Sequence, residues 1–265
     1  MSEPRYHELI DYQLTRYDST LNALIKDHKF TSIECSLDIN LNGKRLTTSF
    51  CSPGDHVDLV TGMLAQMGKI RTKDDIIDLE IDEEKFIADV TTTTEAIEWA
   101  KTSSQNPRYF RARDMLDCDP ELIFERPKSV RFKAKDILSC ADQLLSELAA
   151  THDKTNGVHS GVIFDGSDIL VFREDIGRHN VFDKLYGWTL RNEVDITDKI
   201  IVFSGRCSSE MMMKLGRMGI SSVAAKSVPT TLSIDIAKKL GITLVARMSP
   251  GSFCIYTNPE RIVID

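Results

Sequence analysis

The sequence predicts an α/β fold preceded by a small α+β portion, and two observations support this. From about Gly161 onward, short apolar runs alternate with helical patterns, which is typical of a largely parallel sheet covered by helices. Between residues 30 and 90, strand patterns surround a single helical pattern. With 265 residues, 42% of them hydrophobic, the chain can bury a sizeable core. We divide it into an N-terminal portion, 1–130, and a C-terminal α/β domain, 131–265.

The N-terminal portion opens with strict alternation of apolar and polar residues, which indicates a strand with one buried face. Ser52-Pro-Gly-Asp55 is a helix-start signal, with Ser52 as the cap and Pro53 at the first helical position. The predicted elements are a strand over Ile33–Leu41 with a hairpin turn at Asn42-Gly43, a helix over Val57–Met67 that stops at Gly68, and strands over Asp75–Ile81 and Lys85–Val90.

The segment from Thr91 to Arg131 shows no clear periodicity. It contains four consecutive threonines, a polar stretch before Pro107 and an arginine-rich stretch that ends near Cys118. We therefore predict a mobile excursion over about 91–131. A helical pattern resumes at Asp136, where apolar residues recur on one face as far as Leu148. This helix leads into the C-terminal domain.

The C-terminal domain is predicted to place four polar loops along one edge of its sheet. The predicted strands are Gly161–Phe164, Ile169–Phe172, Ile200–Phe203, Ser222–Ala225, Ile242–Ala246 and Phe253–Tyr256, and helices begin at Asn180, at about Ser209 and at Leu232. Loops that leave the carboxyl ends of parallel strands meet at one edge, where ligands bind. The four loops, rich in Gly, hydroxyls or Arg, are Arg173–Asn180, Ser204–Ser209, Ser227–Thr231 and Arg247–Ser252.

The most highly charged of these segments is the strand-to-helix junction Arg173–Gly187. The first N–H groups of a helix lack partners and favour an anion, so Gly177, Arg178, His179 and Asn180 could cradle one. In the alternative interpretation, the acids and bases of the junction form an ion network that fastens the helix to the sheet. Spacing alone favours this structural interpretation, whereas the cost of burying so many charges keeps a functional one open.

Ser204–Ser209 combines small residues, an Arg and hydroxyls directly before a helix, which suits a phosphate or another anion, although a simple Ser cap explains it equally well. Repetition of this pattern in the last two loops favours a phosphate-bearing ligand. Neither Gly-x-x-x-x-Gly-Lys-Ser/Thr nor Gly-x-Gly-x-x-Gly is present, so a standard NTPase or dinucleotide dehydrogenase is not supported. Zinc-site patterns such as His-Glu-x-x-His are also absent, and we predict no catalytic zinc.

One His and two Cys are candidate reactive residues. His159, before the first strand of the domain, could carry a proton or bind a ligand, although a lone His is more often structural. Cys118 lies near arginines that favour a thiolate, but its flanking acids disfavour one. Its rival is Cys207, at a helix start where the dipole lowers a thiol pKa. The six cysteines contain no Cys-x-x-Cys pair and are interpreted as free thiols, most of them inert and buried.

Composition narrows the choice of partners and location. The net charge of −7 argues against a nucleic-acid partner. The N-terminus lacks the apolar stretch of a signal peptide, and no run approaches the length of a membrane span. We therefore expect a cytoplasmic protein without membrane insertion.

Several separated motifs resemble those of the FdhD/NarQ family of formate dehydrogenase accessory sulfurtransferases. The motifs are Glu174–Asn180 with Asp183-Lys184, Thr155-x-Gly-x-His159, Ser204-Gly-Arg206 with Glu210-Met211, Ser227–Thr231 and Leu244–Tyr256, with weaker matches in Glu34–Gly43, Cys51–Asp55 and Gly62-Met-Leu. The resemblance implies a cytidine-deaminase-like three-layer α/β/α sandwich with a small N-terminal α+β portion, in a homodimer.

The resemblance also implies an activity. A loop Cys in the family accepts sulfur from a cysteine desulfurase and passes it to the molybdenum centre of bis-molybdopterin guanine dinucleotide (bis-MGD), which then goes to formate dehydrogenase. The phosphates of this cofactor agree with the anion-binding loops, and Arg247–Ser252 occupies the place of the family's cofactor-contacting loop. The predicted cofactor-binding residues are His159, Asp175, Arg178, His179, Ser204, Gly205, Arg206, Ser227, Thr230, Arg247, Met248, Ser249, Pro250, Gly251 and Ser252.

The sequence departs from the family at the loop cysteines. Similar members carry Cys-Gly-x-Cys-Gly, whereas only Cys118 remains here. One thiolate is sufficient for a persulfide relay in principle, because each transfer is an attack of one sulfur on another. Our leading hypothesis is a sulfurtransferase with Cys118 as the persulfide carrier, and the alternative is a non-catalytic chaperone that binds the molybdenum cofactor. A nucleoside deaminase, suggested by the fold alone, fails because its zinc ligands and catalytic Glu are missing.

Overall fold

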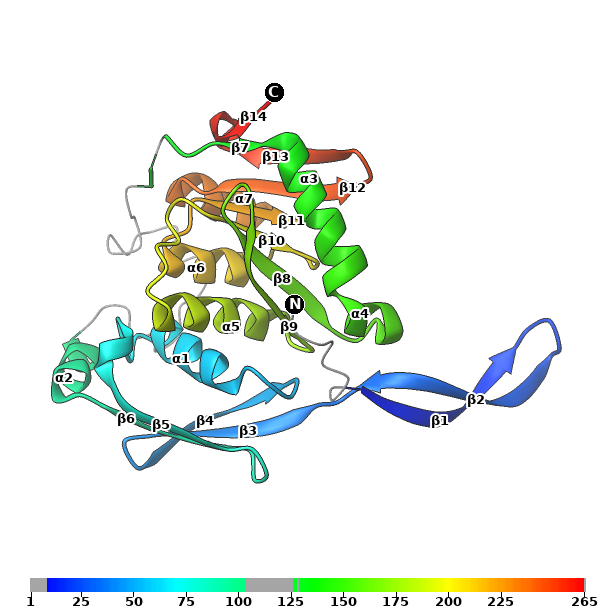
Figure 1. The fold of residues 1–265 in the computed structure, drawn as a ribbon, viewed down its shortest axis with the longest axis horizontal. Coiled ribbons are helices and arrows are strands. Elements are labelled where there is room, and N and C mark those ends of the chain that lie inside the picture. Colours follow the sequence, from blue (N-terminus) through cyan, green and yellow to red (C-terminus); the bar gives the residue numbers. More distant parts are fainter. Residues whose placement is uncertain (1–8, 103–125, 128, 265) are drawn as a thin grey trace.

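The computed structural model describes residues 9–102, 126–127 and 129–264. Within these residues the chain forms a six-stranded sheet, a four-stranded sheet, a long two-stranded arm and a short two-stranded ladder (Figure 1). The two larger sheets are joined through two packed helices, α1 (His56–Gln66) and α5 (Arg178–Arg191). No helix of the described part is both long and apolar enough to cross a membrane.

The four-stranded sheet has the order β4-β3-β6-β5. Its strands are β3 (Cys35–Leu41), β4 (Lys44–Cys51), β5 (Ile76–Asp82) and β6 (Ile87–Thr92). The predicted hairpin is confirmed: Asn42 and Gly43 have φ angles of 52° and 73°, as a two-residue turn between twisted strands requires. The strands predicted over Asp75–Ile81 and Lys85–Val90 correspond to β5 and β6, which pair with each other in antiparallel fashion. Leu37 and Ile39 lie fully buried in the core that this sheet shares with α1.

The start of α1 differs from the prediction. Its cap is Asp55, in a left-handed conformation (φ 53°), and not Ser52. The backbone N–H of Ser52 instead donates to Asp175 (3.1 Å), and its hydroxyl accepts from the N–H of Ile176 (3.0 Å). Local spacing identified a polar residue before the helix but could not reveal a partner more than 120 residues away. The predicted stop at Gly68 is confirmed by its φ of 61°.

The six-stranded sheet has the order β13-β12-β11-β10-β8-β9. Its strands are β8 (His159–Phe164), β9 (Ile169–Asp175), β10 (Ile200–Phe203), β11 (Ser222–Ala225), β12 (Thr243–Ser249) and β13 (Ser252–Thr257). The prediction of a largely parallel sheet is wrong, because only β10–β11 and β11–β12 pair in parallel. The links from β8 to β9 and from β12 to β13 are too short for a crossover helix, so these pairs are antiparallel.

Helices cover both faces of this sheet. The helices of one face are α5, α6 (Ser209–Met218) and α7 (Thr231–Leu240), and α3 (Ala134–Gln143) lies on the other. Alternate residues of each strand enter the two cores. Ile201 and Phe203 pack with α5 and α6, whereas Ile200 and Val202 pack with α3. The central strands are therefore buried on both faces, which explains their continuous apolar sequence.

Part of the predicted mobile excursion is regular structure. β6 continues to Thr92, and α2 (Thr94–Thr102) follows, with the Thr93 hydroxyl accepting from the N–H of Ala96 (3.1 Å). The threonine run therefore ends a strand and caps a helix, a role that its lack of apolar periodicity concealed. Residues 103–125, including Cys118, lie outside the described residues. The predicted domain boundary near residue 131 stays a prediction.

The helix predicted from Asp136 to Leu148 is divided into pieces. α3 continues into a π-helical turn, Leu144–Leu148, and α4 (Ala150–Thr155) follows. The short ladder pairs β7 (Phe132–Lys133) in parallel with β14 (Ile262–Val263). Single 3-10 turns occupy Lys73–Asp75 and Pro259–Arg261.

The arm was not predicted. β1 (Leu9–Asp18) and β2 (Ala23–Ser32) form an antiparallel ribbon that extends away from both sheets (Figure 1). Charged residues interrupt its apolar residues on both faces, so its sequence lacks the alternation that marks a half-buried strand.

α1 and α5 cross at two glycines. A Cβ atom on Gly62 would lie 1.9 Å from the backbone oxygen of Asp183, and one on Gly187 would lie 1.9 Å from the backbone oxygen of Asp58. Only glycine permits this approach. The crossing holds the four-stranded sheet against the six-stranded sheet. It lies beside the Asp58 carboxylate, which is buried and pairs with Arg173 and Arg191.

Candidate functional site

Four strands of the six-stranded sheet end at the same edge. β9, β10, β11 and β12 share one direction, and each leads there into one of the four predicted loops. β8 runs the opposite way, so His159, its first residue, lies at this edge as well. The structure therefore brings together all the segments that supplied predicted cofactor-binding residues. Their role as ligands stays a prediction.

Hydrogen bonds connect these segments in a row. Ser160 donates its N–H to the hydroxyl of Ser204 (2.8 Å) and accepts from the Ser204 N–H at its carbonyl (2.9 Å). Ser227 donates its N–H to the carbonyl of Gly205 (3.3 Å), and its own carbonyl accepts from Arg247 (3.2 Å). The loops thus form one continuous surface. The hydroxyl of Ser204 serves this framework, whereas the Ser227 side chain is exposed.

Each of the four strands brings one basic side chain to this edge. They are Arg178 after β9, Arg206 after β10, Lys226 after β11 and Arg247 near the end of β12. Arg178 is half-buried and the other three are exposed. Clustered positive charge in a chain of net charge −7 attracts anions. We call this surface the basic edge. Lys226 was missed in the sequence, although it directly precedes the predicted Ser227.

Two buried hydroxyl groups lie near the basic edge, that of Ser208 at the start of α6 and that of Ser160 on β8. Ser208 caps this helix without a side-chain hydrogen bond to it. Among the described residues, the hydroxyls of Ser208 and Ser160 are buried and have no hydrogen-bond partner. A buried polar group without a partner is costly. The Ser208 hydroxyl therefore suits a bound polar molecule, together with the free N–H groups of the helix start, whereas Ser160 has the strand parity of Val162 and Phe164 and faces the α3 core.

His159 and Gly205 pack against each other. The imidazole of His159 lies 5.9 Å, centroid to centroid, from the ring of Phe203. Burial, helped by the charge of Arg178, lowers the pKa of His159, so the ring is neutral near pH 7. A Cβ atom on Gly205 would lie 2.6 Å from Phe203 and 3.0 Å from His159 Nδ1. Glycine is thus required for this packing. His159 is held as a neutral group at the edge.

His179 lies between α5 and α6. Its Nε2 is 3.2 Å from a carboxylate oxygen of Glu210, in the first turn of α6. Burial lowers the pKa of His179, with the charge of Lys214 acting in the same direction and Glu210 opposing it. Asp183, one turn further along α5 and adjacent to His179 by helical spacing, pairs instead with Lys214.

Asp175 does not face the basic edge. Its side chain is 0% exposed and both oxygens have partners. Oδ1 accepts from the N–H of Gly177 and the amide of Asn180 (both 2.8 Å), and Oδ2 accepts from Ser52 and pairs with Lys184 (2.8 Å). The structural interpretation of the junction is therefore correct for Asp175 and Lys184. They fasten α5 to the sheet and to the segment before α1, and position Arg178 and His179 indirectly.

Two other predicted loops are more regular than expected. Arg247–Ser252 is the tip of the β12–β13 hairpin, in which only Pro250 and Gly251 form the turn. The hydroxyls of Ser249 and Ser252 bond to each other across it (2.7 Å), and Met248 packs against the α3 core. Thr230 caps α7. Its hydroxyl accepts a hydrogen bond from the N–H of Ser233 (3.3 Å) and therefore already has a partner within the chain.

The sequence pattern of the FdhD/NarQ family matches residues 32–263. The chain belongs to the FdhD/NarQ family. It is 35% identical over 250 residues to a sulfur carrier protein FdhD of Geobacillus kaustophilus, covering 91% of this chain and 92% of that protein. It is 36% identical over 239 residues to a protein of the same name from Staphylococcus haemolyticus, covering 86% of this chain and 88% of that one.

The fold of this FdhD/NarQ chain is also found in a crystal structure from Desulfotalea psychrophila, described as that of a candidate formate dehydrogenase accessory protein. The TM-score is 0.79 and the match covers 96% of this chain and 99% of the other, at 23% identity. The predicted α/β class is confirmed by this likeness.

Most described cysteines of this FdhD/NarQ chain are unsuited to sulfur chemistry. Cys207 was predicted to have a lowered pKa at a helix start, but its thiol is fully buried in the core and burial raises its pKa to about 12. Burial also raises the pKa values of Cys51 and Cys140 to about 12. Cys254, on β13, is exposed. Cys118 lies outside the described residues.

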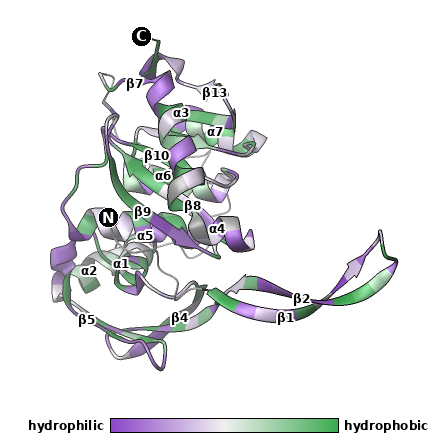
Figure 2. Ribbon diagram, turned by 45° about the vertical axis from the view of Figure 1, so that its right-hand side comes forward, coloured by the Kyte–Doolittle hydropathy of each residue, from purple (hydrophilic) through white to green (hydrophobic). Residues whose placement is uncertain are grey.

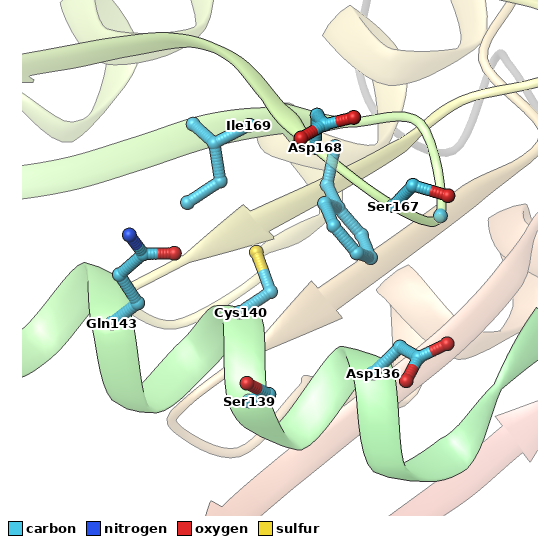
Figure 3. Close-up of a pocket in the computed structure, with 9 residues that line it drawn as sticks. Asp136, Ser139, Cys140, Gln143, Ser167, Asp168 and Ile169 are labelled. Carbon is cyan, nitrogen blue, oxygen red and sulfur yellow. The ribbon is translucent and has the colours of Figure 1, made fainter.

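A cavity of about 440 Å³ lies at the opposite edge of the sheet from the basic edge (Figure 3). It separates α3 from the turn between β8 and β9. Its lining includes Asp136, Ser139, Cys140 and Gln143 of α3, and Ser167 and Asp168 of the turn. None of the predicted cofactor-binding residues lines it, and the raised pKa of Cys140 makes that thiol a poor nucleophile at neutral pH.

Proposed function

We propose that this chain is a sulfur carrier that serves the maturation of formate dehydrogenase. Relatives named sulfur carrier protein FdhD match it over nearly their whole length. The observation that carries the proposal is the basic edge, where four strands running in one direction each present one basic side chain. Such a surface suits a large phosphate-bearing ligand.

The ligand that we propose for the basic edge is the molybdenum cofactor, as bis-MGD, held as cargo. Arg206, Lys226 and Arg247 would bind its phosphates, and the N-terminal turn of α6 with Ser208 offers further donors. The three layers and mixed sheet agree with the cytidine-deaminase-like sandwich that we propose for this unit.

Sulfur would travel on Cys118. Its thiolate would attack the outer sulfur of a persulfide on a cysteine desulfurase, forming a new S–S bond while the desulfurase cysteine leaves as a thiolate. The burial of Cys207 removes its rival from this role. The partners in this proposal are a cysteine desulfurase, formate dehydrogenase and a second copy of the chain, in the cytoplasm.

A chaperone that binds the cofactor without carrying sulfur is the second candidate, because only one Cys stands where similar chains have two. Complementation of a strain without its own accessory protein separates the two. We expect Cys118→Ser to abolish formate dehydrogenase activity, and Cys207→Ala and Cys254→Ser to preserve it. Full activity of Cys118→Ser would establish the chaperone instead.

Binding at the basic edge can be measured with guanosine diphosphate, which carries the guanine and paired phosphates of the proposed cargo. In isothermal titration calorimetry we expect Arg206→Gln, Lys226→Gln and Arg247→Gln each to weaken binding by roughly 10-fold, because each removes a charge-assisted contact of about 1.5 kcal/mol. The difference in affinity between each variant and the native chain should become smaller at high salt, because salt screens the charges.

Lys238→Gln is the matched control for these variants. Lys238 is also exposed but lies in the last turn of α7, at the far end of that helix from the basic edge. Its removal should leave the affinity unchanged. Equal losses for Lys238→Gln and the three edge variants would mean that only the overall charge matters, and would refute a defined site.

A further inference from the structure

The cavity between α3 and the turn from β8 to β9 has polar side chains on both of its walls (Figure 3). α3 contributes Asp136, Ser139 and Gln143, and the turn contributes Ser167 and Asp168. Within the described part of the chain, none of these side chains has a hydrogen-bond or ion-pair partner. Their carboxylate, hydroxyl and amide groups are therefore all available to a bound molecule.

The thiol of Cys140 is directed into the same cavity. Figure 3 shows its sulfur atom pointing from α3 toward the space between the helix and the turn. Cys140 is only 4% exposed, and its side chain has no hydrogen-bond partner among the described residues. Phe164 and Ile169 add apolar surface to the lining. The volume of about 440 Å³ lies within the range of small-molecule sites, roughly 300–1,000 Å³.

Both walls are held in place by the fold. In the turn, a carboxylate oxygen of Asp165 accepts from the N–H groups of Ser167 and Asp168 (both 2.8 Å). On the other wall, Ile137 and Leu144 are buried in the core beneath α3, which leaves the neighbouring polar stripe of the helix over the cavity. Figure 2 shows this mixture of hydrophobic and hydrophilic residues on α3. A ligand would therefore meet walls that are already ordered.

The charge of the lining indicates the class of ligand. Asp136 and Asp168 are the only charged side chains among the nine described residues that line the cavity, and they lie on opposite walls. Carboxylates repel an anion but accept hydrogen bonds from an ammonium group, which has three donors. No group of three metal-binding side chains is found among the described residues, and the cavity is much larger than a single ion. The lining therefore favours a small organic amine.

We propose that this cavity is a second small-molecule site, which binds an organic amine through ion pairs with Asp136 and Asp168. The site is separate from the basic edge, because β8 and β9 run from one to the other. His159 and Asp175 lie at the end of this hairpin next to the basic edge, and Ser167 lies in the turn at the other end. The proposal is independent of sulfur carriage and of the cargo at the basic edge.

Isothermal titration calorimetry with 1,4-diaminobutane tests the site in the full chain. The native chain should bind this diamine and should not bind 1,4-butanediol, which has the same length but no charge. Asp136→Asn and Asp168→Asn should each weaken binding by roughly 10-fold, because each removes a charge-assisted contact. Ser139→Trp, which fills the cavity from an exposed position, should abolish binding.

Asp142→Asn is the matched control for these variants. Asp142 is an exposed acid of the same helix that does not line the cavity, so its replacement should leave the affinity unchanged. Equal losses for Asp142→Asn and Asp136→Asn, equal binding of the diol, or no binding of the diamine to the native chain would overturn the proposal. Guanosine diphosphate should bind Asp136→Asn as it binds the native chain. A loss there would overturn the separation of the two sites.

Chemical labelling of Cys140 provides a second readout. Aminoethyl and sulfonatoethyl methanethiosulfonate each form a mixed disulfide with a thiolate and release methanesulfinate, but the first is a cation and the second an anion. The aminoethyl reagent should label Cys140 faster by roughly 10-fold, and Asp136→Asn/Asp168→Asn should remove this preference. The ratio at Cys254, which is exposed on β13, should not change. A preference at Cys140 that persists in the double variant would overturn the proposal.

Discussion

Lys184→Met is expected to lower the free energy of unfolding by about 3–5 kcal/mol, as breaking one side of a buried ion pair does. Lys184 and Asp175 are 1% and 0% exposed, and their charged atoms lie 2.8 Å apart. Lys184 also donates to the carbonyl of Glu174 (3.0 Å). Met fills the space but leaves the Asp175 carboxylate buried without its counter-charge. Guanidinium titration measures the loss.

Two variants show whether burial is the cause. Lys85→Met breaks an ion pair of similar length with Asp82 (2.7 Å), but on the surface, and should change stability little. Asp175→Asn combined with Lys184→Met removes both buried charges and should recover part of the loss. Equal losses from Lys184→Met and Lys85→Met would contradict the structural role assigned to the junction.

Gly187→Ala should destabilise the chain by about 3 kcal/mol, the upper part of the usual range for overpacking. The new Cβ would lie 1.9 Å from the backbone oxygen of Asp58, and backbone cannot yield as a side chain can. α1 and α5 would have to separate, which also disturbs the pairs of Asp58 with Arg173 and Arg191. Thermal unfolding should show a lower midpoint, and Gly62→Ala, on the facing helix, should behave alike.

Gly216→Ala is the matched control for the crossing. It is the same change within a helix, but the atom that the new Cβ meets, at 2.7 Å, is the end of the Leu240 side chain, which can rotate away. Ala also gains about 1 kcal/mol of helix propensity over Gly, which offsets part of any strain. A midpoint for Gly187→Ala equal to that of Gly216→Ala would show that the helices are not held by this close approach.

The elements that the sequence predicted well are those whose own residues decide their structure. Ile200–Phe203 and Ser222–Ala225 were predicted with the bounds that the structure shows, because strands buried on both faces are continuous small or apolar runs bounded by polar residues. The Asn42-Gly43 turn needs positive φ at both positions, and few other residue pairs permit it.

Two of the incorrect predictions, those for Cys207 and Asp175, have a different cause, since each depends on residues distant in the sequence. Cys207 begins a helix, but its burial comes from packing between α6 and the sheet, and this reverses the expected shift of its pKa. Asp175 was predicted to bind the cofactor, because the sequence could not show that its carboxylate accepts a hydrogen bond from Ser52, which lies before α1 and far from Asp175 in the sequence. The arm has no buried face at all, so periodicity could not mark it. The edge itself was predicted correctly because four strand ends sharing one direction suffice to assemble it.

The most direct test of the account is the mass of the intact protein after incubation with a cysteine desulfurase and cysteine. We expect the native chain to gain the mass of one sulfur atom, located on Cys118 by peptide mapping and removed by reductant. Cys207→Ala and Cys254→Ser should gain the same mass, and Cys118→Ser should gain none. Sulfur found on another cysteine, or none in a preparation that still matures formate dehydrogenase, would contradict the account.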